Sequence, residues 1–169
     1  MESHELHLDR ARATSFGSVA EQYDRYRPEC PDELIDELTA SRPTRVLDVG
    51  CGTGKVARTL ARRGLTALGV EADERMADVA RGHGIEVEVA PFETWDDAGR
   101  RFDLMTCGDA WHWIDPDAGI AKAARVLDPG ARPNPNAPGR RAGVGCRPCG
   151  QDRASGRRAV ASPGRTSRR

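Results

Sequence analysis

Residues 46–55 read VLDVGCGTGK, and this stretch decides the fold of the chain. Its first four residues are apolar around one acid, which is typical of a strand buried on both faces of a parallel sheet. Glycines at positions 50, 52 and 54 permit positive φ and let a ligand approach the backbone closely. A helix is expected over 55–63, with Gly64 as its terminator. Because open α/β sheets bind ligands at the carboxyl ends of their strands, this turn predicts a ligand site.

The spacing of the glycines separates two kinds of ligand. A dinucleotide site has the pattern Gly-x-Gly-x-x-Gly, which places pyrophosphate on a helix N-terminus. This chain has Gly-x-Gly-x-Gly instead, and Asp48 lies two residues before the first glycine. A carboxylate there would repel pyrophosphate but could hold an ammonium group. Lys55 does not complete a phosphate loop, because Val56 follows it. A nicotinamide oxidoreductase is therefore disfavoured, and a plain tight turn is the remaining alternative.

A second acid follows the next predicted strand, over 66–70. Glu71 lies at its carboxyl end, where an acid can accept both hydroxyls of a ribose. The alternative is an exposed charge that opens the following helix, but Asp73 suits that position better. The two acids and the glycine turn together predict a site for a small molecule with an amino-acid end and a ribose end.

Apolar runs and helical patterns alternate along the chain. Strands are expected at 45–49, 66–70, 86–89 and 103–107, and helices at 55–63, 73–81 and 117–127, with a short helical piece within 94–99. This alternation predicts an α/β fold with a parallel sheet and right-handed crossovers. Ile120, Ala124 and Leu127 form the apolar stripe expected of the last helix. Upstream, Ser18 and Glu21 fit a capping box, and Pro31 suits the first position of a helix.

These residues resemble the class I S-adenosylmethionine-dependent methyltransferases, specifically the small-molecule group of methyltransferase type 11 domains. The resemblance runs from about residue 16 to residue 130. Residues 48–54 (DVGCGTG) look like the first motif of the family, residues 69–71 (GVE) like the second, residues 86–95 like the third, and residues 102–107 (FDLMTC) like its fourth strand. Residues 110–115 (AWHWID), with Phe16, Tyr23, Arg27 and Pro28, are similar to the trans-aconitate-type subgroup.

The resemblance implies a Rossmann-like sheet and S-adenosylmethionine as cofactor. The glycine turn and Asp48 would hold the methionine end, Glu71 the ribose hydroxyls, and Pro91 and Phe92 would flank the adenine. The residues implied to bind the cofactor are Asp48, Gly50, Cys51, Gly52, Gly54, Glu71, Ala72, Pro91, Phe92 and Cys107. One departure is that Ala90 and Pro91 stand where many relatives carry an acid for the adenine amino group.

Methyl transfer needs alignment and exclusion of water more than it needs a base. His112 is nevertheless the best candidate base, because it follows the fourth strand and its unperturbed pKa is suitable. Asp109 is a weaker candidate. Phe16 and Tyr23 are expected to cover the pocket, and Trp111 and Trp113 to line the acceptor side. Ordinary packing is the alternative for each of these four aromatic residues, and for His112 it is a place between the two indoles.

The formal net charge of zero hides two unlike segments. Residues 131–169 contain ten Arg, no Lys and one acid, near +9, which leaves 16 basic and 25 acidic residues, near −9, in the remainder. The segment has no Leu, Ile, Met or aromatic residue, so little could offset the entropy of ordering it, and we expect disorder. The predicted organisation is a flexible N-terminus over 1–15, a partial methyltransferase domain over 16–130, and a disordered basic tail over 131–169.

The family's sheet has seven strands, whereas only four are predicted here, in the order 3-2-1-4. The fourth would then be an edge that carries Leu104 and Met105, which predicts non-specific self-association. One hypothesis is that the tail is an out-of-frame reading of a GC-rich gene. Read one base later, the codons of residues 133–136 can encode Leu, Ile or Thr, Leu, and Met or Thr, as a fifth strand would require. A genuine basic tail that binds nucleic acid is the less favoured alternative, because it lacks aromatic residues for stacking.

The remaining features set the cellular context and the overall expectation. The five cysteines are scattered rather than arranged as a disulfide framework, and no metal site is expected. No secretory leader or membrane-spanning run is visible, so the cytoplasm is the expected location. We expect an enzyme that methylates a small molecule. The alternative left open is a remnant that binds the cofactor without turnover, if the missing strands are essential.

Overall fold

A four-stranded parallel sheet lies at the centre of the computed structural model, which describes residues 3–129. The strands are β1 (Val46–Val49), β2 (Ala67–Glu71), β3 (Glu86–Val89) and β4 (Leu104–Thr106), in the order β3-β2-β1-β4. The predicted α/β class, the parallel sheet and the strand order are confirmed. Apolar runs identify these strands well because β1 and β2 are buried on both faces.

The register of the sheet decides which side chains meet at its carboxyl edge. Asp48 in β1 lies opposite Gly69 in β2 and Thr106 in β4. Val49 lies opposite Val70, one residue before Glu71. The two predicted acids therefore end neighbouring strands and face the same edge.

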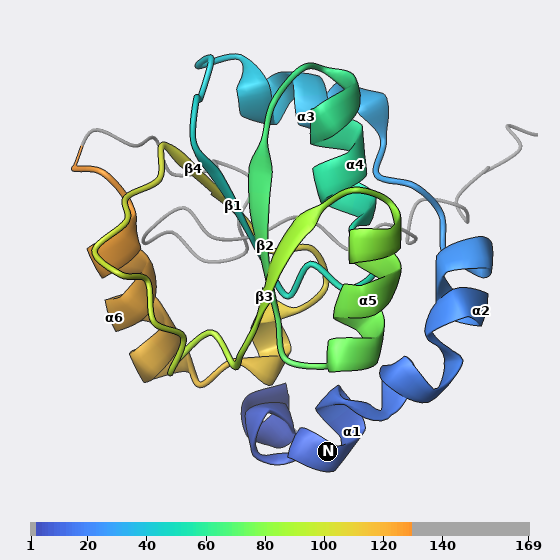
Figure 1. Cartoon of the computed structure of the whole chain (residues 1–169). Coiled ribbons are helices and arrows are strands. Elements are labelled where there is room, and N and C mark those ends of the chain that lie inside the picture. The colour runs from blue at the N-terminus through green and yellow to red at the C-terminus, as the bar shows by residue number, and fades with distance from the viewer. Residues whose placement is uncertain (1–2, 130–169) are drawn as a thin grey trace, which may run out of the picture.

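Helices cover both faces of the sheet. Figure 1 shows α3 (Asp32–Thr39), α4 (Lys55–Arg62) and α5 (Glu74–Gly82) on one side, and α6 (Pro116–Val126) on the other. Successive residues of a strand point to opposite faces of the sheet, so they pack into two separate hydrophobic cores. Val46 and Leu104 pack with Leu60, whereas Leu47 and Met105 pack with Val126. This arrangement places the ends of β1, β2 and β4 at one open edge.

The helix ends follow local chemistry closely. Asp73 caps α5, because its side chain accepts the backbone N–H of Arg75, and Asp115 caps α6 through the N–H of Ala118. Gly64 ends α4 with a φ of 76°. Pro31 is the N-cap of α3 rather than its first residue.

Two sequence predictions about helices are wrong. Ser18 does not begin a capping box, because its hydroxyl donates to the carbonyl of Ser15 inside a short 3-10 helix. Residues 94–99 contain no helix.

The predicted inward stripe of α6 is also wrong. Ile120 is 46% exposed, and the buried residues of this helix are Gly119, Lys122, Ala123 and Val126. A lysine can face inward here because its Nζ lies 2.7 Å from Asp97 and also donates to the carbonyl of Trp95. The ion pair thus sets the rotation of the helix, where hydrophobicity alone predicts a different face.

Residues 3–27 form an N-terminal arm that wraps around the carboxyl edge of the sheet. Two 3-10 helices, η1 (Ser3–Leu8) and η2 (Ser15–Val19), alternate with α1 (Arg10–Ala13) and α2 (Ala20–Tyr26). The flexible terminus expected over 1–15 stays a prediction. Gly17 packs so closely on Asp73 that a side chain there would overlap its carboxylate, and Arg75 donates to the carbonyl of Thr14. The arm is thereby fastened to the start of α5.

β4 is the edge strand of the sheet within residues 3–129. Leu104 and Met105 point to opposite faces of the sheet, and both side chains are buried by the helix layers. Phe102 forms a parallel bridge with Leu127, just after α6. Self-association through this edge stays a prediction.

The predictions made for residues 131–169, including disorder and the shifted reading frame, lie outside the described residues. Across residues 3–129, no helix is long and apolar enough to cross a membrane.

The N-cap of α5 gives a test of the fold. We expect Asp73→Ala to lower the free energy of unfolding by about 1 kcal/mol, because the first turn of α5 loses its side-chain acceptor. Urea unfolding monitored by circular dichroism measures it. Asp78→Ala, on the exposed side of the same helix, removes only an ion pair with Arg81 and should cost less than about 0.5 kcal/mol. Equal losses in the two variants would contradict the capping role.

Candidate functional site

Two adjoining cavities lie at the carboxyl edge of the sheet. The larger has a volume of about 340 Å³ and the smaller about 80 Å³. Both are lined by the glycine turn after β1 (residues 50–54), by the segment after β4 (residues 107–115) and by α2. Their shared lining residues are Tyr23, Arg27, Gly50, Gly52, Gly108 and Asp109. The cavities are therefore two compartments of one site, at the edge where parallel sheets bind ligands.

Asp48 is buried at the floor of the smaller cavity, with 1% of its surface exposed. Its Oδ1 accepts the hydroxyl of Thr106 at 2.8 Å, but its Oδ2 accepts no hydrogen bond of normal geometry. Burial raises its pKa to about 7, although the hydroxyl of Thr106 and the backbone of Ala57 oppose the shift. A buried carboxylate oxygen without a donor favours a ligand that brings one, such as an ammonium group.

Glu71 ties the glycine turn to the start of α5. Its Oε2 accepts the N–H of Gly52 at 2.8 Å, and its Oε1 accepts the N–H of Asp73 at 3.0 Å. Burial raises its pKa, and these two N–H groups work against that shift. Each carboxylate oxygen keeps a further lone pair, and the side chain lines the larger cavity. It can therefore accept hydrogen bonds from ligand hydroxyls while it holds the turn in place.

The turn after β1 needs its first glycine for two reasons. Gly50 has a φ of 61°, which side-chain-bearing residues rarely adopt. A Cβ atom there would overlap the Cβ of Ala110, which follows β4. The turn therefore runs directly against the segment after β4, and its backbone lines both cavities.

The larger cavity also contains the residues expected at the adenine and the ribose. Ala72, Pro91 and Phe92 line it, together with Ala90 and Met76. They follow β2 and β3, so the ends of neighbouring strands supply them. Phe92 is nearly buried and stacks on Trp95 at a centroid distance of 6.4 Å. This part of the lining is apolar, and Glu71 lines the same cavity.

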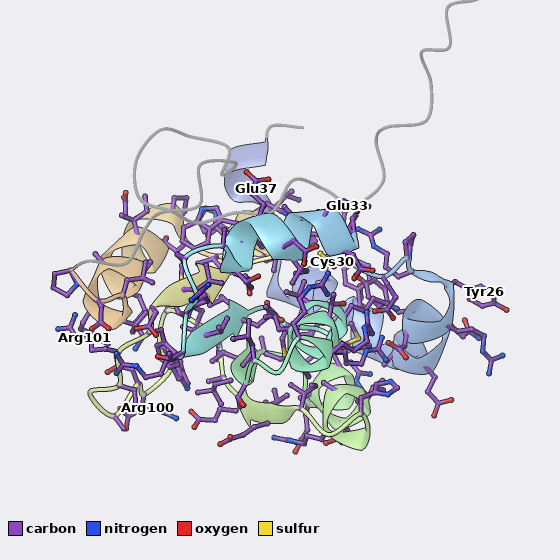
Figure 2. The ribbon with its side chains drawn as sticks, turned by 90° about the horizontal axis from the view of Figure 1, so that it is seen from above. Tyr26, Cys30, Glu33, Glu37, Arg100 and Arg101 are labelled. Carbon is purple, nitrogen blue, oxygen red and sulfur yellow. The ribbon has the colours of Figure 1, made fainter. Side chains whose placement is uncertain are left out.

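Three aromatic side chains line another part of the larger cavity. Phe16 lies edge-on to Tyr23 and to Trp113, with ring centroids 6.0 and 6.4 Å apart. All three line the larger cavity. Figure 2 shows Tyr26 pointing away from the body of the molecule, where it is 77% exposed. Of the two tyrosines in α2, the one at position 23 thus faces the site.

Arg27 and Asp109 form an ion pair at the boundary of the two cavities. They are 82 residues apart, at the end of α2 and in the segment after β4. Asp109 has a φ of 54°, a strained conformation for a residue with a side chain. Asp109 therefore holds the N-terminal arm against the sheet edge, which leaves it poorly placed to act as a base.

His112 lines the larger cavity beside Trp113, at a centroid distance of 4.7 Å. Partial burial lowers its pKa, and the charge of Asp109 acts in the opposite direction. The imidazole is therefore neutral at neutral pH and able to accept a proton.

Three predicted site residues line neither cavity. Trp111 and Cys107 line neither cavity and belong to the core between the sheet and α6, where Trp111 packs on Gly119. Gly54 also lines neither cavity; it is the N-cap of α4, with a φ of 83°. Cys51 does line the smaller cavity, and burial raises the pKa of its thiol.

Sequence analysis did not identify two important residues of the site. Thr106 could have been found, because the predicted strand order places it beside Asp48. Arg27 was noted only as part of the cap, and its pairing with Asp109 has no sequence signal. Among residues 3–129, no cluster of three or more His, Cys, Asp or Glu could hold a metal ion.

The fold and this edge define a parallel α/β domain with an acid among the last two residues of each of two neighbouring strands. A family profile described as "Methyltransferase domain" matches residues 46–130, and the chain belongs to this family. S-adenosylmethionine is the methyl donor of the family.

Relatives of known sequence agree with this assignment. An uncharacterized methyltransferase of Mycobacterium tuberculosis is 40% identical over 126 residues, which is 73% of this chain and 51% of the relative. A ubiquinone biosynthesis O-methyltransferase of Hahella chejuensis is 39% identical over 107 residues, which is 59% of this chain and 45% of that protein. The chain thus spans about half the length of the curated relatives it matches.

Solved structures show the same fold. An amino pentose methyltransferase from Micromonospora echinaspora, solved with S-adenosylmethionine bound, aligns with a TM-score of 0.53 at 29% identity, covering 72% of this chain and 50% of that one. A TehB-like methyltransferase from Corynebacterium glutamicum aligns with a TM-score of 0.57 at 19% identity, covering 73% and 71% of the two chains.

The close approach of Gly50 to Ala110 can be measured. We expect Gly50→Ala to lower the free energy of unfolding by at least about 2 kcal/mol, from backbone strain and steric overlap together. Gly64→Ala is the matched control, since Gly64 also has a positive φ but no atom within 4 Å of an added Cβ. It should cost about 1 kcal/mol, from strain alone. Urea unfolding of both variants gives the difference, and equal losses would show that the turn does not press on the segment after β4.

Proposed function

We propose that this chain is an S-adenosylmethionine-dependent methyltransferase that acts on a small molecule. The observation that carries the proposal is the pair of carboxylates at one sheet edge, with the glycine turn between them. The Oδ2 atom of Asp48 is buried in the smaller cavity and accepts no hydrogen bond of normal geometry, and Glu71 lines the larger cavity. These groups match the ammonium and ribose ends of the cofactor, so the residues present fit it.

The binding residues divide between the two compartments. Asp48, Cys51 and the backbone of Gly50 and Gly52 would hold the methionine end in the smaller cavity. Glu71 and Ala72 would hold the ribose, and Pro91 and Phe92 would flank the adenine. When bound, the cofactor supplies a methyl group on a positively charged sulfur, so the protein needs only to align the acceptor and exclude water.

The acceptor side would lie between the N-terminal arm and the segment after β4. Phe16, Tyr23 and Trp113 enclose it, and His112 can take a proton from an acceptor that carries one. The names of two relatives support a small acceptor: one is a ubiquinone biosynthesis O-methyltransferase and the other an amino pentose methyltransferase. A turnover assay with S-adenosylmethionine separates an active enzyme from a remnant that only binds the cofactor.

Glu71→Ala tests the position of the ribose. We expect it to weaken binding of S-adenosylhomocysteine by about 1–3 kcal/mol, because the ribose hydroxyls lose their acceptor. Isothermal titration calorimetry measures the change, and thermal unfolding checks that the turn survives the loss. Glu74→Ala, an exposed acid in the first turn of α5, is the control and should bind as the parent chain does. Unchanged affinity in Glu71→Ala would place the ribose elsewhere.

The raised pKa of Asp48 predicts a pH dependence of binding. Below about pH 7 the carboxyl of the free protein is protonated, so it must lose its proton before it can pair with an ammonium group. Affinity for S-adenosylhomocysteine should therefore rise by up to about tenfold per pH unit between about pH 5 and 7, then level off.

The Asp48→Asn variant isolates the share of Asp48 in this dependence. The pKa of Glu71 is also raised, so its titration acts in the same direction. The asparagine variant should bind more weakly at pH 8 and should show a clearly flatter pH profile than the parent chain. Calorimetry at several pH values measures both, and an identical profile in the two proteins would remove Asp48 from the ammonium site.

A further inference from the structure

The acceptor side of the larger cavity is built mainly from rings. Phe16 and Tyr23 come from the N-terminal arm, and His112 and Trp113 come from the segment after β4. The Phe16 ring meets the Tyr23 and Trp113 rings edge-on, at interplanar angles of 67°. Two segments about 90 residues apart thus form one aromatic wall, and its edge-to-face geometry suits a flat aromatic ligand.

The charged side chains on this side already have partners. Arg27 is paired with Asp109, and Glu93 accepts the backbone N–H of Asp115 at 3.0 Å. A carboxylate group on an acceptor could pair with Arg27 only by breaking its ion pair with Asp109 in a partly buried place, which is costly. A neutral acceptor avoids that cost.

His112 is the imidazole in this aromatic wall and lines the larger cavity. Partial burial keeps its imidazole neutral, so it can accept one proton. The groups that face it are Asp109, which favours the protonated form, and the indole of Trp113. A phenolic hydroxyl, with a pKa of about 10, is far closer to imidazole in acidity than an aliphatic alcohol is.

Resting on the proposed methyltransferase function, we propose that the methyl acceptor is a neutral aromatic alcohol whose ring lies against Phe16 and Trp113 and whose hydroxyl lies beside His112. In the transfer, the oxygen–methyl bond forms as the sulfur–methyl bond breaks. The hydroxyl proton passes to His112, and S-adenosylhomocysteine is the second product. Arg27 and Asp109 stay paired and serve to position the arm.

Calorimetry on the full chain, saturated with S-adenosylhomocysteine, tests the acceptor class. The probes are 2-naphthol, its saturated analogue decahydro-2-naphthol, and 2-naphthoate. We expect 2-naphthol to bind at least fivefold more tightly than either of the other two. Equal binding of the saturated alcohol, preference for the carboxylate, or no binding of 2-naphthol would overturn the proposal. Failure of S-adenosylhomocysteine to bind would instead count against the proposed function.

Matched variants locate the ring. Phe16→Leu and Trp113→Leu should each weaken 2-naphthol binding at least threefold, with S-adenosylhomocysteine affinity changed less than twofold. Val19→Ala is the control, because Val19 lies in the same 3-10 helix, is similarly exposed and lines neither cavity. A loss in Val19→Ala equal to that in Phe16→Leu would contradict the assignment of the ring site.

The rate of methyl transfer tests whether His112 accepts the hydroxyl proton. His112→Asn should lower methyl transfer to 2-naphthol at least tenfold at neutral pH, and the rate should recover as rising pH ionises the naphthol. Transfer to 4-nitrophenol, of which a substantial fraction is already ionised at neutral pH, should change less than threefold. Equal losses on both acceptors would show that His112 shapes the wall and takes no proton.

Discussion

Burial of one carboxylate constrains the rest of this site. Asp48 lies at the end of a strand that is covered on both faces, and one of its oxygens accepts a hydroxyl from the neighbouring strand while the other accepts no hydrogen bond of normal geometry. Such a group is costly to bury unless a ligand completes its hydrogen bonds. The cost is tolerated here because the sheet fixes Asp48 and Thr106 in register before any ligand arrives. Stability is thus exchanged for a preformed acceptor, which in the proposed function holds the ammonium group of the cofactor.

The second acid works through the backbone. Glu71 accepts N–H groups from both the glycine turn and the start of α5, so it stiffens the loop that a ligand would touch. The turn also cannot shift toward the segment after β4, because Gly50 lies directly against Ala110. The two strand ends and the segment after β4 therefore form one rigid edge. Rigidity of this kind is what alignment-driven chemistry requires.

The parts of the fold that local rules control could be predicted from the sequence. The strands, the glycine turn and the cap at Asp73 follow from apolar runs, positive φ and side-chain acceptors, all read within a few residues, whereas the strand order is implied by the resemblance to the family. The rotation of α6 could not, because it depends on Lys122 finding Asp97, which lies 25 residues away in the sequence. Trp111 and Trp113 show the same limit: two neighbouring indoles look alike in the sequence, yet one packs in the core and the other lines the cavity.

The same reasoning explains why the acceptor side differs from the cofactor side. The cofactor side is supplied by strand ends, whose positions the hydrogen-bonded sheet fixes. The acceptor side depends on an arm that is held by side chains, through Arg27 with Asp109 and Gly17 against Asp73. Such contacts can be changed without disturbing the sheet. The proposed cofactor side is therefore fixed by the sheet, whereas the proposed acceptor side depends on where the arm places the rings of Phe16 and Tyr23.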